Sequence, residues 1–137
     1  MKSIALSTRC KVCGFTLIES IIAVVVVVIL AVISLPSYSD YVRRGVRAEA
    51  QAFLTEVATR QQQRLVDRRE YAATIADLGV APPKSLAGKY TVSMSAPAVV
   101  PPAFTIWAAP QGPQAAEGCG TLTLTSAGQR GPAHCWR

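Results

Sequence analysis

A single carboxylate, Glu19, stands near the start of a long run that otherwise carries no charge. The run covers residues 15–35, which is roughly 31 Å of helix at 1.5 Å per residue and matches the hydrocarbon thickness of a bilayer. An acid inside such a span costs on the order of 2.5 to 3.5 kcal/mol, and intramembrane acids are candidates for functional sites. The sequence therefore predicts a role for Glu19, with a tolerated charge near the membrane interface as the alternative.

Other residues that could do chemistry are sparse. His134 is the sole histidine, no nucleophile stands beside a base, and no phosphate-binding glycine loop follows a predicted strand. We interpret His134 as a surface side chain, because no second metal ligand lies at a usable spacing. Trp107 and Trp136 are interpreted as packing residues rather than a ligand platform. The expectation is no enzymatic activity, no metal and no cofactor.

The four cysteines fall into two pairs. Cys10 and Cys13 form a C-x-x-C, but a redox motif needs a folded scaffold and a zinc site needs two more ligands. Cys119 and Cys135 enclose a distal loop whose closure is worth on the order of 3 kcal/mol in the chain-entropy model. A disulfide there indicates an oxidising, extracytoplasmic side. A C-terminal part outside the cytoplasm sets the direction in which the apolar run crosses the membrane. The basic residues do not set it, because they stand on both sides of the run.

Beyond Pro36 the chain becomes amphipathic, which predicts a continuation of the same helix. Pro36 lacks the amide of a helix interior, so a kink near Val32 to Ile33 is expected. The helix should end around Arg69 to Ala72, before a short turn and Pro82-Pro83. Its apolar positions recur mostly three or four residues apart: Tyr38, Tyr41, Val42, Val46, Ala50, Phe53, Leu54, Val57 and Leu65.

Three segments of the C-terminal half alternate apolar and polar residues, as strands do. They cover residues 89–95, 103–108 and 119–125 and are separated by Pro/Gly-rich turns. The residues expected to form the apolar layer against the helix are Tyr90, Val92, Met94, Phe104, Ile106, Leu122 and Leu124. The expected fold class is α+β, with a three- to four-stranded antiparallel sheet packed on one long helix.

The 137 residues leave room for only one small folded domain beyond the helix. The formal net charge is +6, and three of the basic residues precede the apolar run: Lys2, Arg9 and Lys11. The remainder is therefore only mildly basic.

The segment Gly14-Phe15-Thr16-Leu17-Ile18-Glu19, behind a short basic leader and ahead of an apolar stretch that closes with Pro36, resembles the type IV pilins. The resemblance implies that a prepilin peptidase cuts between Gly14 and Phe15 and methylates the new N-terminus. It also implies that Glu19 pairs with the N-terminal ammonium of a neighbouring subunit during filament assembly. Two buried charges offset each other's desolvation cost only by meeting, which is consistent with that role.

The C-terminal part is also similar to this family. Residues 119–124, then Gly128, then Cys135-Trp136 resemble the end of short minor pilins, whose disulfide closes the C-terminal region. The resemblance implies a removed leader at 1–14, a transmembrane and assembly helix at 15–36, its amphipathic half at 37–71 and a headgroup at 72–137. The sequence departs from that of many major pilins at Ser20 and in the uniform valine run at 24–28.

The function implied is that of a structural minor pilin in pilus assembly, and hence in motility or adhesion. Its partners would be other pilin subunits, prepilin peptidase and the inner-membrane assembly machinery. The chain would span the inner membrane once with a periplasmic headgroup, and then enter an extracellular pilus of a Gram-negative-type bacterium.

Two alternatives remain. The first is a DNA-binding minor pilin for DNA uptake, with Arg130, His134 and Arg137 as contacts and Lys84 and Lys89 close by. Capture of phosphate needs several convergent cations, and few are present. The second is a type II secretion pseudopilin. Calcium sites in that family use clustered acids, whereas Glu117 is the sole acid after Gly79.

Overall fold

The computed structural model describes residues 15–136, apart from the side chains of residues 34–37. Gly14 and Arg137 lie outside the described residues, so the predicted cleavage site and one predicted nucleic-acid contact stay predictions. The chain divides into two compact units, residues 1–37 and 38–137, which are described separately. The helix and strands are α1 (Leu17–Arg68), β1 (Tyr90–Ser95), β2 (Thr105–Pro110), β3 (Leu122–Thr125) and β4 (Arg130–Gly131).

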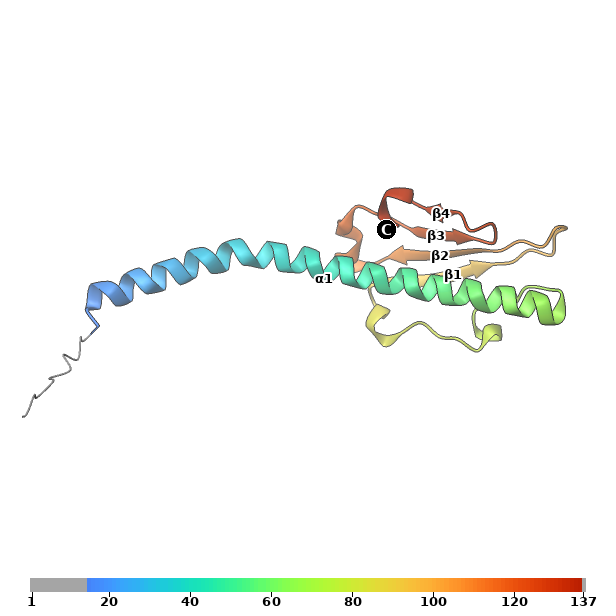
Figure 1. Cartoon of the computed structure of the whole chain (residues 1–137), viewed down its shortest axis with the longest axis horizontal. Coiled ribbons are helices and arrows are strands. Elements are labelled where there is room, and N and C mark those ends of the chain that lie inside the picture. Colours follow the sequence, from blue (N-terminus) through green and yellow to red (C-terminus); the bar gives the residue numbers. More distant parts are fainter. Residues whose placement is uncertain (1–14, 137) are drawn as a thin grey trace, which may run out of the picture. The chain divides into compact units, whose positions relative to one another are not determined.

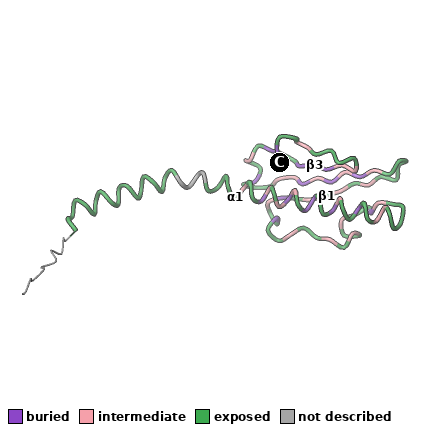
Figure 2. The backbone as a smooth tube through the Cα atoms, in the orientation of Figure 1, coloured by how far each residue is buried: buried purple, intermediate pink, exposed green. Residues whose placement is uncertain are grey.

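The N-terminal part of α1 carries apolar side chains all round and exposes them. From Phe15 to Ile33 the large hydrophobic side chains are 48–79% exposed, as the green tube in Figure 2 shows. By length and composition α1 is the one helix of the described residues that could cross a membrane. A helix that is apolar on every side needs lipid or other helices around it.

The later part of α1 lies along the sheet and forms the core with it (Figure 1). Its buried side chains recur at helical spacing, which confirms the predicted amphipathic helix. They are Val46, Ala50, Phe53, Leu54 and Val57, all at most 8% exposed. At the start of this stretch the prediction was wrong, because Tyr38 and Tyr41 are 69% and 75% exposed and Val42 is 40% exposed.

The sheet is antiparallel with strand order β1-β2-β3-β4, as the α+β prediction requires. Each strand alternates between the core and the outer face. Tyr90 on β1, Ile106 on β2 and Leu122 on β3 are buried, while Thr91 and Ser93 are exposed. Phe104, just before β2, contacts Tyr71 edge-on with ring centroids 4.8 Å apart. The apolar layer therefore has the members that the alternation predicted.

The predicted third strand began too early. Residues 119–121 are not strand, and β3 starts at Leu122. Gly118 and Gly120 have φ angles of 79° and 62°, a left-handed conformation that breaks an extended chain. A short fourth strand follows a tight turn in which the amide of Gly128 donates to the carbonyl of Thr125.

A buried glutamine closes the end of α1. The helix ends at Arg68, within a residue of the predicted position. Gln61 is fully buried, and its side-chain amide makes two bonds to the backbone of Ala72. Its Nε2 donates to the Ala72 carbonyl at 2.9 Å, and its Oε1 accepts from the Ala72 amide at 2.8 Å. The chain leaving the helix is thereby held against it.

Candidate functional site: the first turn of α1 and the disulfide corner

Glu19 lies in the first turn of α1, behind a capping threonine. The Thr16 side-chain oxygen accepts a hydrogen bond from the Glu19 amide at 3.3 Å. Threonine followed three residues later by glutamate is the sequence of a capping box, in which the threonine satisfies a free amide of the first turn. A carboxylate at this end is also favoured by the partial positive charge of the helix N-terminus.

The capped helix start was not predicted from the sequence, and it favours a carboxylate at Glu19 through the helix N-terminus rather than through a bond of the side chain. The signal was present in Thr16-Leu17-Ile18-Glu19, where the polar residues stand three apart. Phe15 precedes the cap and is 77% exposed. Of the three predicted assembly residues, Phe15 and Glu19 therefore lie at the start of α1, and Pro36 lies within it with a side chain outside the described residues. The predicted pairing of Phe15 and Glu19 with a neighbouring subunit stays a prediction.

Cys119 and Cys135 form a disulfide, as predicted, with their Cα atoms 6.0 Å apart. His134 is exposed next to it, and one of its ring nitrogens lies within 4.8 Å of both sulfurs. The two sulfurs are bonded to each other, so neither is a thiolate that could ligate a metal. The bond joins the loop before β3 to the last turn of the chain.

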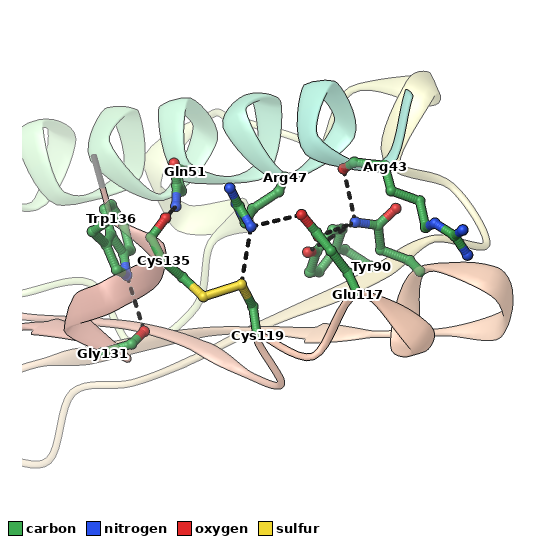
Figure 3. The surroundings of a disulfide bond; sticks show 10 residues. Arg43, Arg47, Gln51, Tyr90, Glu117, Cys119, Gly131, Cys135 and Trp136 are labelled. Atoms are coloured by element: carbon green, nitrogen blue, oxygen red, sulfur yellow. Dashed lines mark hydrogen bonds and ion pairs between the residues drawn. A yellow bond between two sulfur atoms is a disulfide. The ribbon is translucent and has the colours of Figure 1, made fainter. Parts of the chain in front are cut away.

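Side chains of α1 hold both ends of this disulfide (Figure 3). Nη1 of Arg47 lies 2.6 Å from Oε1 of Glu117 and 3.0 Å from Sγ of Cys119. One turn further along, Nε2 of Gln51 donates to the carbonyl of Cys135 at 2.7 Å. The C-terminal loop is thus attached to the helix by a charged pair and by an amide.

A second glutamine, Gln114, extends the network and is 3% exposed. Its Nε2 donates to the Arg43 carbonyl at 2.9 Å and to Oε2 of Glu117 at 2.7 Å, and it lies 3.3 Å from the Tyr90 hydroxyl. Burial raises the pKa of Tyr90 above its usual value of 10.0, against the opposing effect of Gln114. The arrangement is a structural clamp.

The residues predicted to contact DNA are only partly brought together. Arg130 is exposed on β4, with its guanidinium 5.3 Å from the ring centre of Trp136. The Trp136 indole donates to the Gly131 carbonyl at 2.9 Å, which fixes the ring. The expectation that Lys84 and Lys89 lie close by was wrong, because they precede β1, at the opposite edge of the sheet from β4.

Residues 9–35 match the prokaryotic N-terminal methylation motif. Residues 36–123 match a family described as "Type IV minor pilin ComP, DNA uptake sequence receptor", which is well over half of the chain. The chain belongs to the type IV pilin family. Together the two matches run without a break from the predicted leader into β3, and this pilin's Cys135 lies beyond them.

Several named pilins are similar over part of this pilin. A fimbrial protein of Neisseria meningitidis is 33% identical over 81 residues, covering 59% of this chain and 48% of that protein. The type IV major pilin protein PilE1 of Neisseria gonorrhoeae is 35% identical over 78 residues, covering 56% and 47%. The type IV major pilin protein PilA of Myxococcus xanthus is 32% identical over 83 residues, covering 61% and 38%. The matched part of this pilin spans about half of these relatives or less.

A solved type IV pilin from Shewanella oneidensis shares the fold. It superposes with a TM-score of 0.57 at 28% identity, covering 69% of this pilin and 98% of that chain. The helix-on-sheet architecture predicted from periodicity is therefore the pilin fold.

Proposed function

We propose that this pilin is a minor subunit of the type IV pilus, cut after Gly14, methylated at Phe15 and anchored in the inner membrane before assembly. The observation that carries the proposal is the N-terminal part of α1. It presents large apolar side chains on every side, and its one carboxylate belongs to Glu19, whose backbone amide is capped by Thr16. A surface of this kind is stable in lipid or among other apolar helices, and a subunit that moves from membrane to filament needs both.

The pseudopilin alternative receives no support from the headgroup. Glu117, the sole acid after Gly79, is occupied by Arg47 and Gln114. A calcium site needs six to eight oxygen ligands, several of them usually carboxylates. We therefore keep the pilus as the proposed assembly.

The proposal is tested by intact mass and N-terminal sequencing of the protein from sheared surface filaments and, separately, from membranes. An N-methylated Phe15 in filaments is the expected result. An uncut chain confined to membranes would contradict it. The ratio of this chain to the most abundant filament subunit in the same sample measures whether its role is minor.

As a second function we propose binding of duplex DNA, because the matched family is described as a DNA uptake sequence receptor. The matched residues stop at 123, before Arg130 and His134. Within them, a groove of about 190 Å³ near the end of α1 is lined by three arginines spaced four apart, Arg60, Arg64 and Arg68. The same groove is lined by Asp67 and Asp77, which the arginines outnumber.

Arg64 is only partly satisfied in this groove. Its Nη1 donates to the Asp77 carbonyl at 3.2 Å and its Nη2 pairs with Oε1 of Glu70 at 3.5 Å, while its Nε is buried with no partner among the described residues. The buried Nε of Arg64 cannot reach a ligand, so contacts to phosphate at this groove would come from the exposed Arg60 and Arg68.

Gel retardation of duplex DNA over a salt series tests this second function. Phosphate contacts make affinity fall steeply with salt. Arg60→Gln should weaken retardation, whereas Arg130→Gln, which removes the same single charge at the DNA contact predicted from the sequence, should not. Equal loss in both variants would place the contacts elsewhere, and no retardation of the wild type at low salt would end the DNA proposal.

A further inference from the structure

The loop between β1 and β2 ends in an exposed apolar tip, residues 97–102. From Ala96 to Phe104 the loop has no polar side chain, and all of residues 97–102 are exposed. Val100 is 98% exposed and Val99 is 47% exposed. Runs of more than about four exposed apolar residues are a liability in a folded domain unless they bind something. The tip therefore has the character of an interaction surface.

Three prolines prepare the tip for docking. Pro97, Pro101 and Pro102 restrict the backbone, so less conformational entropy is lost when the tip is bound. Within the tip, the amide of Val99 donates to the Pro97 carbonyl at 2.9 Å. Proline-rich segments bind in grooves that are lined by aromatic side chains. An uncharged tip of this kind fits a concave, apolar surface with an aromatic side chain in it.

The headgroup itself carries such a groove, of about 390 Å³, which is in the range of ordinary binding sites. Its apolar lining comes from Tyr38, Val42, Val46 and Pro113. Tyr38 and Val42 are 69% and 40% exposed, so both can be covered by a partner. They belong to α1, the helix whose apolar part is proposed above to pack among other subunits. The groove thus continues that surface along the helix.

The cations of the groove lining do not oppose an apolar occupant. Arg43 is paired with Asp40 at 2.9 Å. Lys89 is half-buried, and the methylene groups of a lysine pack on apolar surface while its ammonium stays in water.

The tip and the groove lie at opposite ends of the β1–β2 hairpin. Lys89 of the groove directly precedes β1, whereas the tip follows Ser95, the last residue of β1. The six paired residues of β1 separate the two by roughly 17 Å, at about 3.4 Å per residue. Figure 1 shows the tip at the free end of this hairpin. The tip therefore cannot enter the groove of its own chain, but it can enter that of another copy.

We propose that the apolar tip of one copy of this pilin docks in the groove of a second copy. Val100 would enter between Val42 and Pro113, and Pro101 would lie against Tyr38. Because the two surfaces differ, each copy keeps a free tip at one end and a free groove at the other. Contacts of this head-to-tail kind extend into rings or open helical filaments.

The contact acts together with the packing of α1. A single loop buries less than the about 1,000 Å² that a specific interface needs by itself. Subunits already held together by their helices meet at a high effective concentration, where a weak second contact adds to the affinity. The inference rests on filament assembly in the proposed function and names a headgroup contact for it.

Disulfide trapping between two full-length variants in detergent tests the docking. One chain carries Val100→Cys, and the other carries Val42→Cys with a longer tag, so that the heterodimer is identified by its size on a non-reducing gel. Mild oxidation should give several-fold more heterodimer than the same Val100→Cys chain gives with Ser93→Cys, an exposed position of β1. All chains also carry Cys10→Ser and Cys13→Ser, which removes the thiols of the predicted leader.

A charge placed in the tip should prevent the docking. Val99→Glu, added to the Val100→Cys chain, should lower the heterodimer yield several-fold, because a carboxylate would have to enter an apolar groove. Ser93→Glu adds the same charge outside the tip and should leave the yield unchanged. The melting temperature of each variant shows that its headgroup is folded.

Two results would overturn the tip contact: equal heterodimer yields with the Val42→Cys and Ser93→Cys partners, or equal yields for the Val99→Glu and Ser93→Glu chains. The trapping needs neither cleavage nor filaments, so its outcome is separate from that of the pilus proposal. Methylated Phe15 in filaments without preferential trapping would sink the tip contact alone. An uncut membrane chain with preferential trapping would sink the pilus role alone.

Discussion

Arg47 on α1 and Glu117 before β3 form an ion pair of 2.6 Å across 70 residues of sequence, and their side chains are only 23% and 10% exposed. The same guanidinium nitrogen contacts Sγ of Cys119. Because the Glu117 carboxylate is nearly buried, the hydrogen bonds and the positive charge that stabilise it come from Arg47 and Gln114 rather than from water. The pair thus links the helix to the disulfide loop.

Arg47→Leu is expected to lower the free energy of unfolding of the headgroup by about 1–3 kcal/mol, since it leaves a nearly buried carboxylate without its cation. Urea unfolding of residues 38–137 measures the change. Arg44→Leu, an exposed neighbour on the same helix, is the control and should have little effect. Equal stabilities for wild type and Arg47→Leu would show that the pair contributes nothing.

Cys119→Ser should destabilise the headgroup by about 3 kcal/mol and make it protease-sensitive, because the unfolded chain regains the freedom of the open loop. Membrane insertion should be intact. Thermal melting with and without a reductant measures the effect, and the reductant should have no effect on the variant. An unchanged melting temperature would refute the structural role of the disulfide.

Gln61→Leu removes both partners of the Ala72 backbone in a fully buried place. Each buried polar group left without a partner costs about 1–3 kcal/mol, so a loss of at least about 2 kcal/mol is expected. Denaturant unfolding measures it, with exposed Gln62→Leu as the matched control. A free energy of unfolding within about 0.5 kcal/mol of wild type, the size of ordinary surface effects, would show that the two bonds of Gln61 do not stabilise the headgroup.

Glu19→Ala should leave processing intact but strongly reduce recovery of the protein in filaments, because the proposed partner of the N-terminal ammonium is lost. Quantitative mass spectrometry of filaments and membranes measures both. Thr16→Val is the control for capping, since it removes the hydrogen-bond acceptor at the helix start but keeps the carboxylate. If Thr16→Val lowers recovery as much as Glu19→Ala, the cap rather than the ion pair explains the defect.

The headgroup should lose stability as the pH rises above 10. Burial raises the pKa of Tyr90 in the folded state. The unfolded state therefore ionises first, and the stabilisation present below its pKa is lost as the pH rises through the folded pKa. Unfolding free energies between pH 8 and 11.5 should fall less for Tyr90→Phe than for wild type. Parallel curves would show that Tyr90 is not the group responsible.

Periodicity was sufficient to predict most of the fold. The spacing of Val46, Ala50 and Val57 placed the helix against the sheet, and alternation along 90–95 placed β1. Both patterns report which face is buried, and burial dominates the energetics of these elements. The predicted start of β3 was three residues too early. Gly118 and Gly120 adopt left-handed φ angles, and the sequence does not show whether a glycine will adopt such an angle.

The polar contacts of the core could not be predicted in the same way. Gln61 stands in a polar stretch of the helix and Gln114 in a Gly/Pro/Ala-rich connection, and nothing in either stretch indicates that a glutamine is buried there. Their partners, the Ala72 backbone and the Arg43 carbonyl, are fixed only once the chain is folded. The cap at Thr16 is different, because its spacing to Glu19 is local and readable.

The attachment of α1 to the end of the chain has a consequence for biosynthesis. Gln51 binds the carbonyl of Cys135, which is synthesised 84 residues later. Arg47 contacts Cys119, which is synthesised 72 residues later. At translation rates of 5–20 residues per second, Gln51 waits roughly 4 to 17 s for its partner. During this time the apolar face of the helix has no complete sheet to cover it. A factor that shields nascent chains would therefore raise the yield of folded subunit without changing any contact of the mature core.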